Sequence, residues 1–337
     1  MGRPRILVAD SPESWSRDLT LERSHLPADC EIQRFCWRGD VGALVDAAKY
    51  ADAILTDFVP FESDVLERLE GCQLISVSAT GFDTVNVKRA AELGISVCCV
   101  GEYCTEEVAD HSLALMLALN RKLLQYHRQV QQDRSWAWND IRGIFRLTGQ
   151  VLGVIGMGRI GRAVARRAGA FGLRIVAYDP CLSGEQMPEG VASVSLPELL
   201  QQSNIITLHC NYDPHKGAVL DQSAFEAMTQ RPMLINVARG GLVDEAALVS
   251  ALECGQLVGA ALDVLSGEPP ELNAHPLLER ENVIITPHVA FFSEQSVEQV
   301  RVISAANITA FLDGRFAEVY RFVHHARGKS SGEKSWA

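Results

Sequence analysis

The sequence has a deficit of basic residues and lacks any long apolar run. Its 31 Lys and Arg residues stand against 42 Asp and Glu, a formal net charge of −11. Such a surface disfavours nucleic acids and anionic membranes as partners. The longest apolar stretch, Ser112 to Leu119, falls short of the roughly 20 residues that a membrane-spanning helix needs. Residues 5–9 are too short an apolar run for a signal peptide. We therefore expect a cytoplasmic protein without nucleic-acid or membrane partners.

The cysteines lack the spacing of a metal site or a redox motif. There are nine, an odd number, and none of them forms a Cys-x-x-Cys pair; Cys98 and Cys99 are the only adjacent ones. This scatter predicts reduced thiols and no bound metal. A length of 337 residues with 47% hydrophobic content is enough for two packed domains.

Residues 5 to about 100 alternate short apolar runs with helical stretches. We expect helices at 41–49, 63–69 and 87–93, between strands at 6–8, 32–35, 53–55, 74–77 and 97–99. Alternation of this kind predicts a parallel sheet with helices on both faces.

A helical stretch separates this block from a second one. Apolar residues recur at helical spacing from Val108 to Leu123 and predict a long amphipathic helix that crosses from one domain to the other. The second block begins at Val151, and a last helix is expected from Glu294 to about Leu312. Its further strands are expected near 174–178, 205–208, 233–236, 258–262 and 283–286.

A glycine motif opens the second block. The run Gly156-Met-Gly-Arg-Ile-Gly161 follows the apolar strand 151–155 and leads into a helical stretch, 162–171. Glycines there let the backbone turn tightly and approach a pyrophosphate at a helix N-terminus. Asp179 ends the next strand, where a carboxylate can accept a hydrogen bond from a ribose hydroxyl. The combination predicts dinucleotide binding.

Three residues with acid–base or anion-binding chemistry come after later strands. Arg239 is followed by two glycines, and its planar guanidinium suits a two-point grip on a carboxylate. His288 follows Pro287, and imidazole exchanges protons near neutral pH. Glu268 would orient the His288 ring and favour its protonated form. Ligands of parallel sheets bind beyond the carboxyl ends of the strands, so these residues are expected in one cleft.

Each residue by itself has a simpler interpretation. A single arginine is usually an exposed ion-pair partner, and a single histidine usually has a packing role. The common placement after strands, downstream of a cofactor motif, is what favours catalysis. His111, within the long helix, is interpreted as structural or as a domain or subunit contact. His209, which ends the strand 205–208, either lies near the adenosine side of the cofactor or packs in the core.

These segments resemble the D-isomer-specific 2-hydroxyacid dehydrogenases over about residues 5 to 320. The stretches that carry the resemblance are 153–161, 236–244, 260–264 with Glu268-Pro269, and Thr286-Pro-His288. Within the family, 207–210 and 287–295 look most like the branch of the C-terminal-binding-protein corepressors and their bacterial relatives.

The resemblance implies an α/β fold of two doubly wound parallel-sheet domains. A flavodoxin-like substrate domain would comprise residues 1–100 and 295–325. A Rossmann NAD-binding domain, residues 101–294, would be inserted in it, with hinges near Gly101 and Ala290. Residues 326–337 are expected to form a disordered tail. The resemblance also implies a homodimer built largely on the cofactor domains.

The resemblance further assigns roles to individual residues. Arg239 would hold the carboxylate and 2-oxo group of the substrate, and His288, with Glu268 as its partner, would be the proton donor for reduction. Backbone amides around Ala79, Thr80 and Gly81 would bind the substrate carboxylate, and Asp263 would accept from the nicotinamide carboxamide. The residues implied in cofactor binding are Gly156, Gly158, Arg159, Ile160, Gly161, Asp179, His209, Cys210, Val237, Ala238 and Asp263.

Two residues narrow the activity. Formate dehydrogenases of the superfamily carry Gln where Glu268 stands, so Glu268 favours a substrate whose oxygen exchanges a proton. NADP-preferring members lack the acid of Asp179, because a carboxylate repels the 2′-phosphate, so the chain is expected to use NAD. We therefore predict an NAD-dependent dehydrogenase, or 2-oxoacid reductase, of small D-2-hydroxy acids.

Two alternatives stay open, an NAD(H)-sensing corepressor-like binding protein and a phosphite dehydrogenase. The acidic charge favours an enzyme. So do two departures from the corepressors, Phe291 in place of their Trp and no long tail. Gly101 stands where many relatives have Pro, which predicts a looser hinge.

The sequence leaves the 2-oxo acid open among glyoxylate, hydroxypyruvate, phenylpyruvate and branched acids. Six apolar residues could wall the substrate or equally be packing residues: Phe58, Val59, Phe291, Phe292, Trp136 and Trp138.

Overall fold

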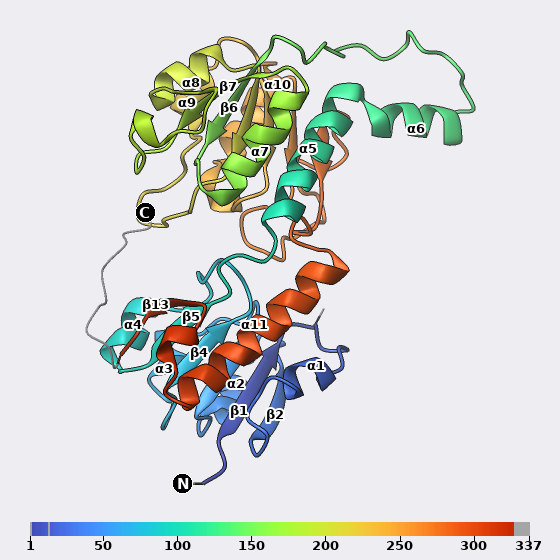
Figure 1. Cartoon of the computed structure of the whole chain (residues 1–337). Coiled ribbons are helices and arrows are strands. Elements are labelled where there is room, and N and C mark those ends of the chain that lie inside the picture. The colour runs from blue at the N-terminus through green and yellow to red at the C-terminus, as the bar shows by residue number, and fades with distance from the viewer. Residues whose placement is uncertain (1, 13, 327–337) are drawn as a thin grey trace. The chain divides into compact units, whose positions relative to one another are not determined.

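The computed structural model describes residues 2–12 and 14–326 (Figure 1), so most of the expected tail, 326–337, lies outside the described residues. The chain divides into two compact units. One unit runs up to Tyr103 and resumes at Ser293, and the other is Cys104–Phe292. Each is an α/β unit built on a mainly parallel sheet, which confirms the predicted fold class. The functional roles of the two domains stay a prediction.

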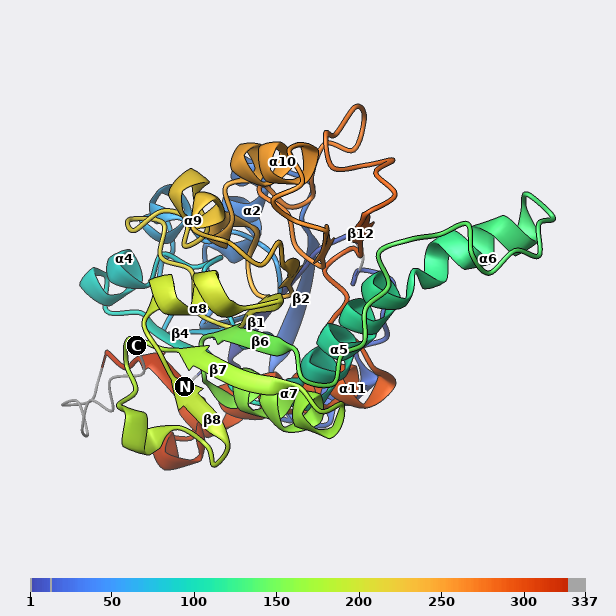
Figure 2. The same ribbon diagram turned by 90° about the horizontal axis from the view of Figure 1, so that it is seen from above.

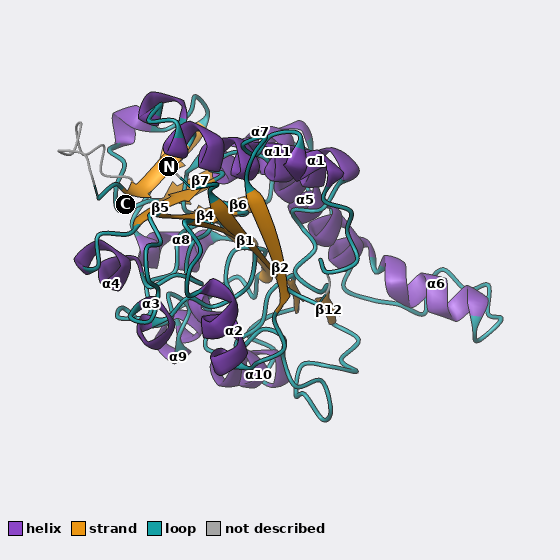
Figure 3. Cartoon of the chain, turned by 90° about the horizontal axis from the view of Figure 1, so that it is seen from below, coloured by secondary structure: helices purple, strands orange, loops and turns teal. Residues whose placement is uncertain are grey.

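The first unit has a six-stranded sheet in the order β13-β5-β4-β3-β1-β2, and Figure 3 labels four of these strands, β5, β4, β1 and β2. All neighbours are parallel except β13, which pairs antiparallel with β5. The strands are β1 (Arg5–Asp10), β2 (Glu31–Cys36), β3 (Ala53–Thr56), β4 (Leu74–Val77), β5 (Ser96–Cys99) and β13 (Arg321–His324). The five parallel strands fall where the sequence predicted them, and β13 was not foreseen.

Helices cover both faces of this sheet. They are α1 (Thr20–Arg23), α2 (Val41–Ala48), α3 (Ser63–Leu66), α4 (Val87–Glu92), α11 (Glu294–Leu312) and the 3₁₀ turn η3 (Phe316–Glu318). Leu44, Val65 and Ala90 of α2, α3 and α4 belong to the core of one face. Ile308 and Phe311 of α11 belong to the core of the other. Residues from after Phe292 therefore complete the unit that the N-terminal strands begin.

The second unit has a seven-stranded, all-parallel sheet in the order β12-β11-β10-β9-β6-β7-β8. The strand order reverses between β6 and β9, which creates the crevice where doubly wound sheets bind dinucleotides. The strands are β6 (Val151–Ile155), β7 (Arg174–Tyr178), β8 (Val191–Ser193), β9 (Ile205–Leu208), β10 (Met233–Asn236), β11 (Gly259–Leu262) and β12 (Val283–Ile285). Of these strands, only β8 was not predicted.

The second unit also contains the long helix of the sequence analysis. Its helices are α5 (Thr105–Arg121), α6 (Leu123–Gln131), α7 (Arg159–Ala170), α8 (Leu196–Gln202), α9 (Gln222–Glu226), α10 (Glu245–Glu253) and the 3₁₀ turns η1 (Gly184–Gln186) and η2 (Gly240–Leu242). Helix α5 packs on α7, β10, β11 and β12 and lies wholly in this unit. The expectation that it crosses between domains is therefore wrong. The apolar face of α5 packs against the sheet of its own unit and against α7.

Helix α6 and the segment 133–146 form an arm that extends from the rest of the unit (Figure 2). Lys122, at φ +56°, turns the chain between α5 and α6. The Tyr126 hydroxyl donates to the Trp138 carbonyl at 2.8 Å and the Gln129 side chain to the Ala137 carbonyl at 3.1 Å. These bonds hold the returning segment along α6. No helix among the described residues has the length and apolar character that crossing a bilayer requires.

Candidate active site

The glycine turn after β6 uses its three glycines for different reasons. A Cβ on Gly156, at φ +93°, would lie 2.6 Å from the Cys210 nitrogen, and one on Gly161 would lie 2.1 Å from the Gly156 oxygen. The fold itself therefore requires these two glycines. A Cβ on Gly158 would have no protein atom within 4 Å. Gly158 also precedes α7, where no side chain caps the first turn. The turn thus leaves room where a pyrophosphate would meet the helix N-terminus.

Asp179 is tied to this turn. Its Oδ2 accepts a hydrogen bond from the Met157 nitrogen at 2.8 Å, and its Oδ1 accepts one from the Cys181 nitrogen at 2.9 Å. The carboxylate therefore stands at the carboxyl end of β7, beside the glycine turn. That is where a ribose hydroxyl of a dinucleotide would reach it.

His209 and Cys210 follow β9, and their backbone lies against Gly156 of the glycine turn. The His209 nitrogen donates to the Ile155 carbonyl at 2.7 Å, and its Nε2 lies 2.9 Å from Thr207 Oγ1. Burial lowers the pKa of His209 to about 3 and raises the pKa of the Cys210 thiol to about 11. Both side chains are therefore neutral near pH 7.

The loop that carries Arg239 is shaped by close packing. The Asn236 side chain donates to the Arg239 carbonyl at 2.9 Å and accepts from the Ala238 nitrogen at 3.1 Å, which closes a tight turn after β10 and Val237. A Cβ on Gly240 would lie 2.1 Å from the carbonyl of Leu265. Gly240 therefore brings the Arg239 loop against the loop that carries Glu268.

Glu268 and His288 form a direct pair. His288 Nδ1 lies 2.5 Å from Glu268 Oε2, and the other oxygen, Oε1, accepts from the Leu265 nitrogen at 3.1 Å. The two side chains are 28% and 31% exposed, so solvent or a ligand can reach them. With Nδ1 donating to the carboxylate, a proton that the ring exchanges with a ligand would be the one on Nε2.

Backbone hydrogen bonds to Asp263 hold the loop that carries His288. The Val289 nitrogen donates to Oδ1 at 2.9 Å, the Ala290 nitrogen to Oδ2 at 2.8 Å and the His288 nitrogen to the Asp263 carbonyl at 2.7 Å. Thr286 Oγ1 lies 2.5 Å from Oδ1. The contact of Asp263 with nicotinamide that the resemblance implies stays a prediction.

The structure therefore gathers Arg239, Glu268 and His288 on adjoining loops of the second unit. The predicted carboxylate loop, Ala79 to Gly81, follows β4 of the first unit. There the Val100 nitrogen donates to the Ala79 carbonyl at 3.0 Å, and Thr80 Oγ1 donates to the Gly101 carbonyl at 2.8 Å. The role of this loop in substrate binding stays a prediction.

Other sequence expectations fare differently. Val59 is fully buried in the core of the first unit, so it cannot wall a substrate. Gly101 adopts φ +70°, and a Cβ on it would lie 2.7 Å from the Tyr320 ring. Proline cannot adopt this angle. The sequence reasoning missed the contacts of His111 and Thr286 with Asp263, because no local pattern signals them.

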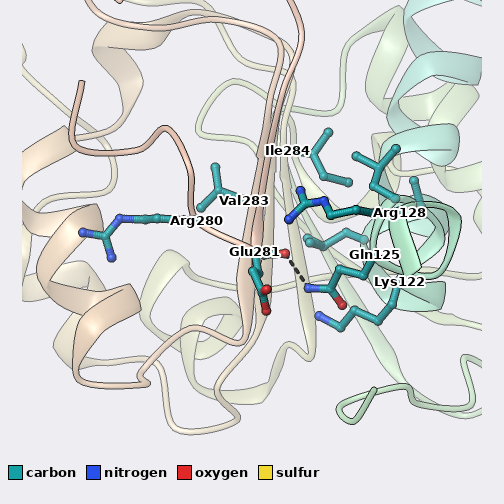
Figure 4. A pocket seen from close by; sticks show the side chains of 10 residues that line it. Lys122, Gln125, Arg128, Arg280, Glu281, Val283 and Ile284 are labelled. Carbon is teal, nitrogen blue, oxygen red and sulfur yellow. Dashed lines mark hydrogen bonds between the residues drawn. The ribbon is translucent and has the colours of Figure 1, made fainter. Parts of the chain in front are cut away.

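A small hollow of about 40 Å³ beside α6 lies apart from these residues (Figure 4). Lys122, Gln125, Arg128 and Glu281 are among its lining residues, and the Gln125 amide donates to the Glu281 carbonyl at 2.6 Å. It has room for only a few water molecules, because each needs about 10–15 Å³ of such space. Among the described residues, no group of three or more His, Cys, Asp or Glu side chains is placed to hold a metal ion.

Comparison with known proteins identifies the class. The family model for the NAD-binding domain of D-isomer specific 2-hydroxyacid dehydrogenases matches residues 113–290. The chain is 33% identical over 309 residues to a glycerate dehydrogenase of Methylorubrum extorquens, an alignment covering 89% of this chain and 94% of that protein. The chain therefore belongs to the D-isomer-specific 2-hydroxyacid dehydrogenases. It is an oxidoreductase whose cofactor is NAD, as the sequence predicted.

Two further relatives extend the comparison. A D-3-phosphoglycerate dehydrogenase of Archaeoglobus fulgidus is 34% identical over 80% of this chain, which spans 51% of that protein. The crystal structure of D-lactate dehydrogenase from Aquifex aeolicus, complexed with NAD and lactic acid, has a TM-score of 0.85 at 27% identity and covers 94% of this chain and 98% of that one. The resemblance to the corepressor branch stays a prediction.

Proposed function

We propose that this enzyme reduces a small 2-oxo acid to the D-2-hydroxy acid with NADH, or runs the reverse reaction. This proposal rests on the 2.5 Å contact of His288 Nδ1 with Glu268 Oε2. The loop that carries Glu268 packs against the loop that carries Arg239, so the three side chains come from neighbouring loops. The relatives named for glycerate and lactate act on acids of this size, which supports a three-carbon 2-oxo acid such as hydroxypyruvate or pyruvate.

In this proposal each residue has one task. NADH supplies the hydride that C2 of the substrate receives. Arg239 holds the carboxylate through its guanidinium fork. His288 Nε2–H gives its proton to the oxygen on C2 as negative charge builds there, and Glu268 holds the ring while the imidazolium loses that proton. In the oxidation direction Nε2 takes the proton back. Backbone amides of residues 79–81 are proposed to complete the carboxylate site.

We also propose that NAD is preferred to NADP. The Asp179 carboxylate is fixed by the Met157 and Cys181 nitrogens and carries a negative charge where a 2′-phosphate would lie. Turnover with NADH should therefore exceed turnover with NADPH.

The test is the loss of NADH absorbance with a panel of 2-oxo acids, with NADPH run in parallel. Turnover with hydroxypyruvate, pyruvate, glyoxylate or phenylpyruvate supports the proposal and names the substrate. NADH binding without turnover on the whole panel would instead favour an NAD(H)-sensing binding protein. Reduction of NAD by phosphite alone would favour phosphite oxidation.

His288→Gln gives the matched test of the proton donor. Removing a general acid should lower kcat by about 10²- to 10⁴-fold while NADH affinity stays within about twofold. The control is His275→Gln, because His275 approaches Glu245 instead, its Nε2 3.6 Å from Oε2, and should leave kcat unchanged. Near wild-type kcat in His288→Gln would remove this histidine from the mechanism.

We further propose a homodimer formed through the arm. Trp136 and Trp138 are 92% and 84% exposed, and Leu123 and Leu124 are 54% and 53% exposed. Apolar side chains concentrated on one ordered extension are typical of an interface.

A cytoplasmic location is proposed as well, because all nine cysteines are free thiols, which suits a reducing compartment.

A further inference from the structure

We propose that His111 of α5 is a positioning residue for the catalytic loop and acts through Thr286 and Asp263. His111 Nε2 lies 3.1 Å from Thr286 Oγ1, which in turn lies 2.5 Å from Asp263 Oδ1. The imidazole is also 3.6 Å from Oδ1 itself. These hydrogen bonds join helix α5 to the loop that carries His288, although His111 and Thr286 are 175 positions apart in the sequence. The inference rests on the proposed role of His288.

The hydrogen bonds between His111, Thr286 and Asp263 can be assigned donors and acceptors in only one consistent way. Both Asp263 oxygens already accept backbone N–H groups, from Val289 and Ala290, as an ionised carboxylate does. Thr286 therefore donates its single proton to Asp263 Oδ1. Its oxygen is left to accept, so His111 Nε2 must carry a hydrogen. His111 is thereby assigned either as the Nε2–H tautomer or as the imidazolium.

The loop needs such support because His288 has φ +50°. A residue other than glycine keeps this left-handed conformation only where its surroundings determine it. Here the carbonyl of Asp263 accepts a hydrogen bond from the His288 nitrogen, and its carboxylate accepts from the nitrogens of Val289 and Ala290. The side chain of Asp263 is fully buried, whereas that of His111 is 23% exposed. His111 and Thr286 thus fix the orientation of the buried group on which the loop depends.

Variants of His111 separate positioning from packing. His111→Leu removes the donor and should lower kcat about 10-fold, because a small displacement of an acid–base group costs this much or more. KM for the 2-oxo acid and the affinity for NADH should change less than about twofold, since Arg239 and the glycine turn are untouched. His111→Gln places an N–H at the same reach as Nε2 and should restore kcat. His111→Asn is one bond shorter and should not.

The same chain can be broken at its middle. Thr286→Val should reproduce His111→Leu, Thr286→Ser should restore kcat, and the double variant His111→Leu/Thr286→Val should be no slower than either single variant. Multiplied losses in the double variant would mean that the two residues act separately, and would overturn the proposal.

The protonation state of His111 is a test that does not need turnover. In ¹⁵N-histidine-labelled wild-type protein, assigned by the signal lost in His111→Gln, the His111 ring should show hydrogen on Nε2. A bare Nε2 would overturn the proposal, and so would full kcat in His111→Leu. If wild-type protein turned over no 2-oxo acid, the proposed function would fail while this spectrum still decided the hydrogen-bond chain.

Discussion

At the scale of single residues, the glycine turn separates what the fold requires from what the cofactor requires. Gly158 has φ −69°, an ordinary angle for any residue, and open space where its side chain would be. Gly161 faces the Gly156 oxygen at a distance that no Cβ tolerates. The two glycines therefore serve different functions although they belong to one motif.

Gly158→Ala and Gly161→Ala should differ accordingly. Gly158→Ala should fold with an unchanged Tm and bind NADH at least about 10-fold more weakly, because its methyl group occupies the path of the pyrophosphate. Gly161→Ala should lose about 1–3 kcal/mol of stability from overpacking. Thermal unfolding and NADH titration measure both effects. Equal loss of Tm in the two variants would show that Gly158 is structural.

His209 makes stability depend on pH. In the unfolded chain histidine takes up a proton as the pH falls through about 6.5, but folded His209 stays neutral to a pKa of about 3. Its contribution to stability is therefore full above pH 6.5 and is lost as the pH falls. Between about pH 7 and pH 5 the loss should be about 2 kcal/mol.

The comparison of wild type with His209→Gln isolates this effect. The glutamine cannot titrate, so the fall in Tm between the two pH values should be smaller in the variant by several degrees. NADH binding at pH 7 serves as the check that the crevice is intact. The same fall in Tm for both proteins would mean that His209 titrates normally in the folded state.

At the scale of elements, an ion pair fastens helix α11 to α1. Arg301 donates two hydrogen bonds of 2.7 Å to the carboxylate of Glu22, whose side chain is fully buried. Arg17 lies 3.3 Å from the same carboxylate. Removing one partner of a buried pair leaves an uncompensated charge, which is costly in a way that exposed pairs are not.

Arg301→Met should therefore destabilise the first unit by about 3 kcal/mol, near the lower end for broken buried pairs because Arg17 remains. Arg89→Met is the matched control, since its partners Glu67 and Glu92 have side chains 50% and 49% exposed. That variant should lose less than about 1 kcal/mol. Urea unfolding measures both. Similar losses in the two variants would show that the burial of Glu22 does not matter.

The elements also show what could be predicted from the sequence. All described strands except β8 and β13 were predicted, and so was the helix Glu294–Leu312, because their signals are local. The pattern of Gly156, Arg239 and His288 is local as well. Strand β8 (Val191–Ser193) is largely exposed, and β13 begins with Arg321 and ends with His324, so neither edge strand forms the apolar run that marks the other strands. The break after α5 depends on the angle of Lys122, and the contact of His111 with Thr286 depends on tertiary packing. Neither leaves a trace in the local sequence.

At the scale of the whole molecule, the chain leaves the first unit at Tyr103 and returns at Ser293. Within the described residues, two connections therefore link the unit that carries residues 79–81 to the unit that carries Arg239, Glu268 and His288. Near the first of them, Gly101 is held by its packing against Tyr320 and by its hydrogen bond from Thr80. This contact argues against the looser hinge expected from the absence of proline, although hinge motion itself stays a prediction.

The arm determines the expected state of assembly. If it forms the dimer interface, the wild-type protein should have a mass near twice 36.9 kDa by light scattering at micromolar concentration. Leu123→Glu/Leu124→Glu should shift it to the monomer, because charges replace apolar side chains that the partner would bury. Leu272→Glu is the control, since Leu272 is exposed to a similar extent, 56%, but lies outside the arm. A monomeric wild type would refute the dimer, and a dimeric double variant would place the interface elsewhere on the molecule.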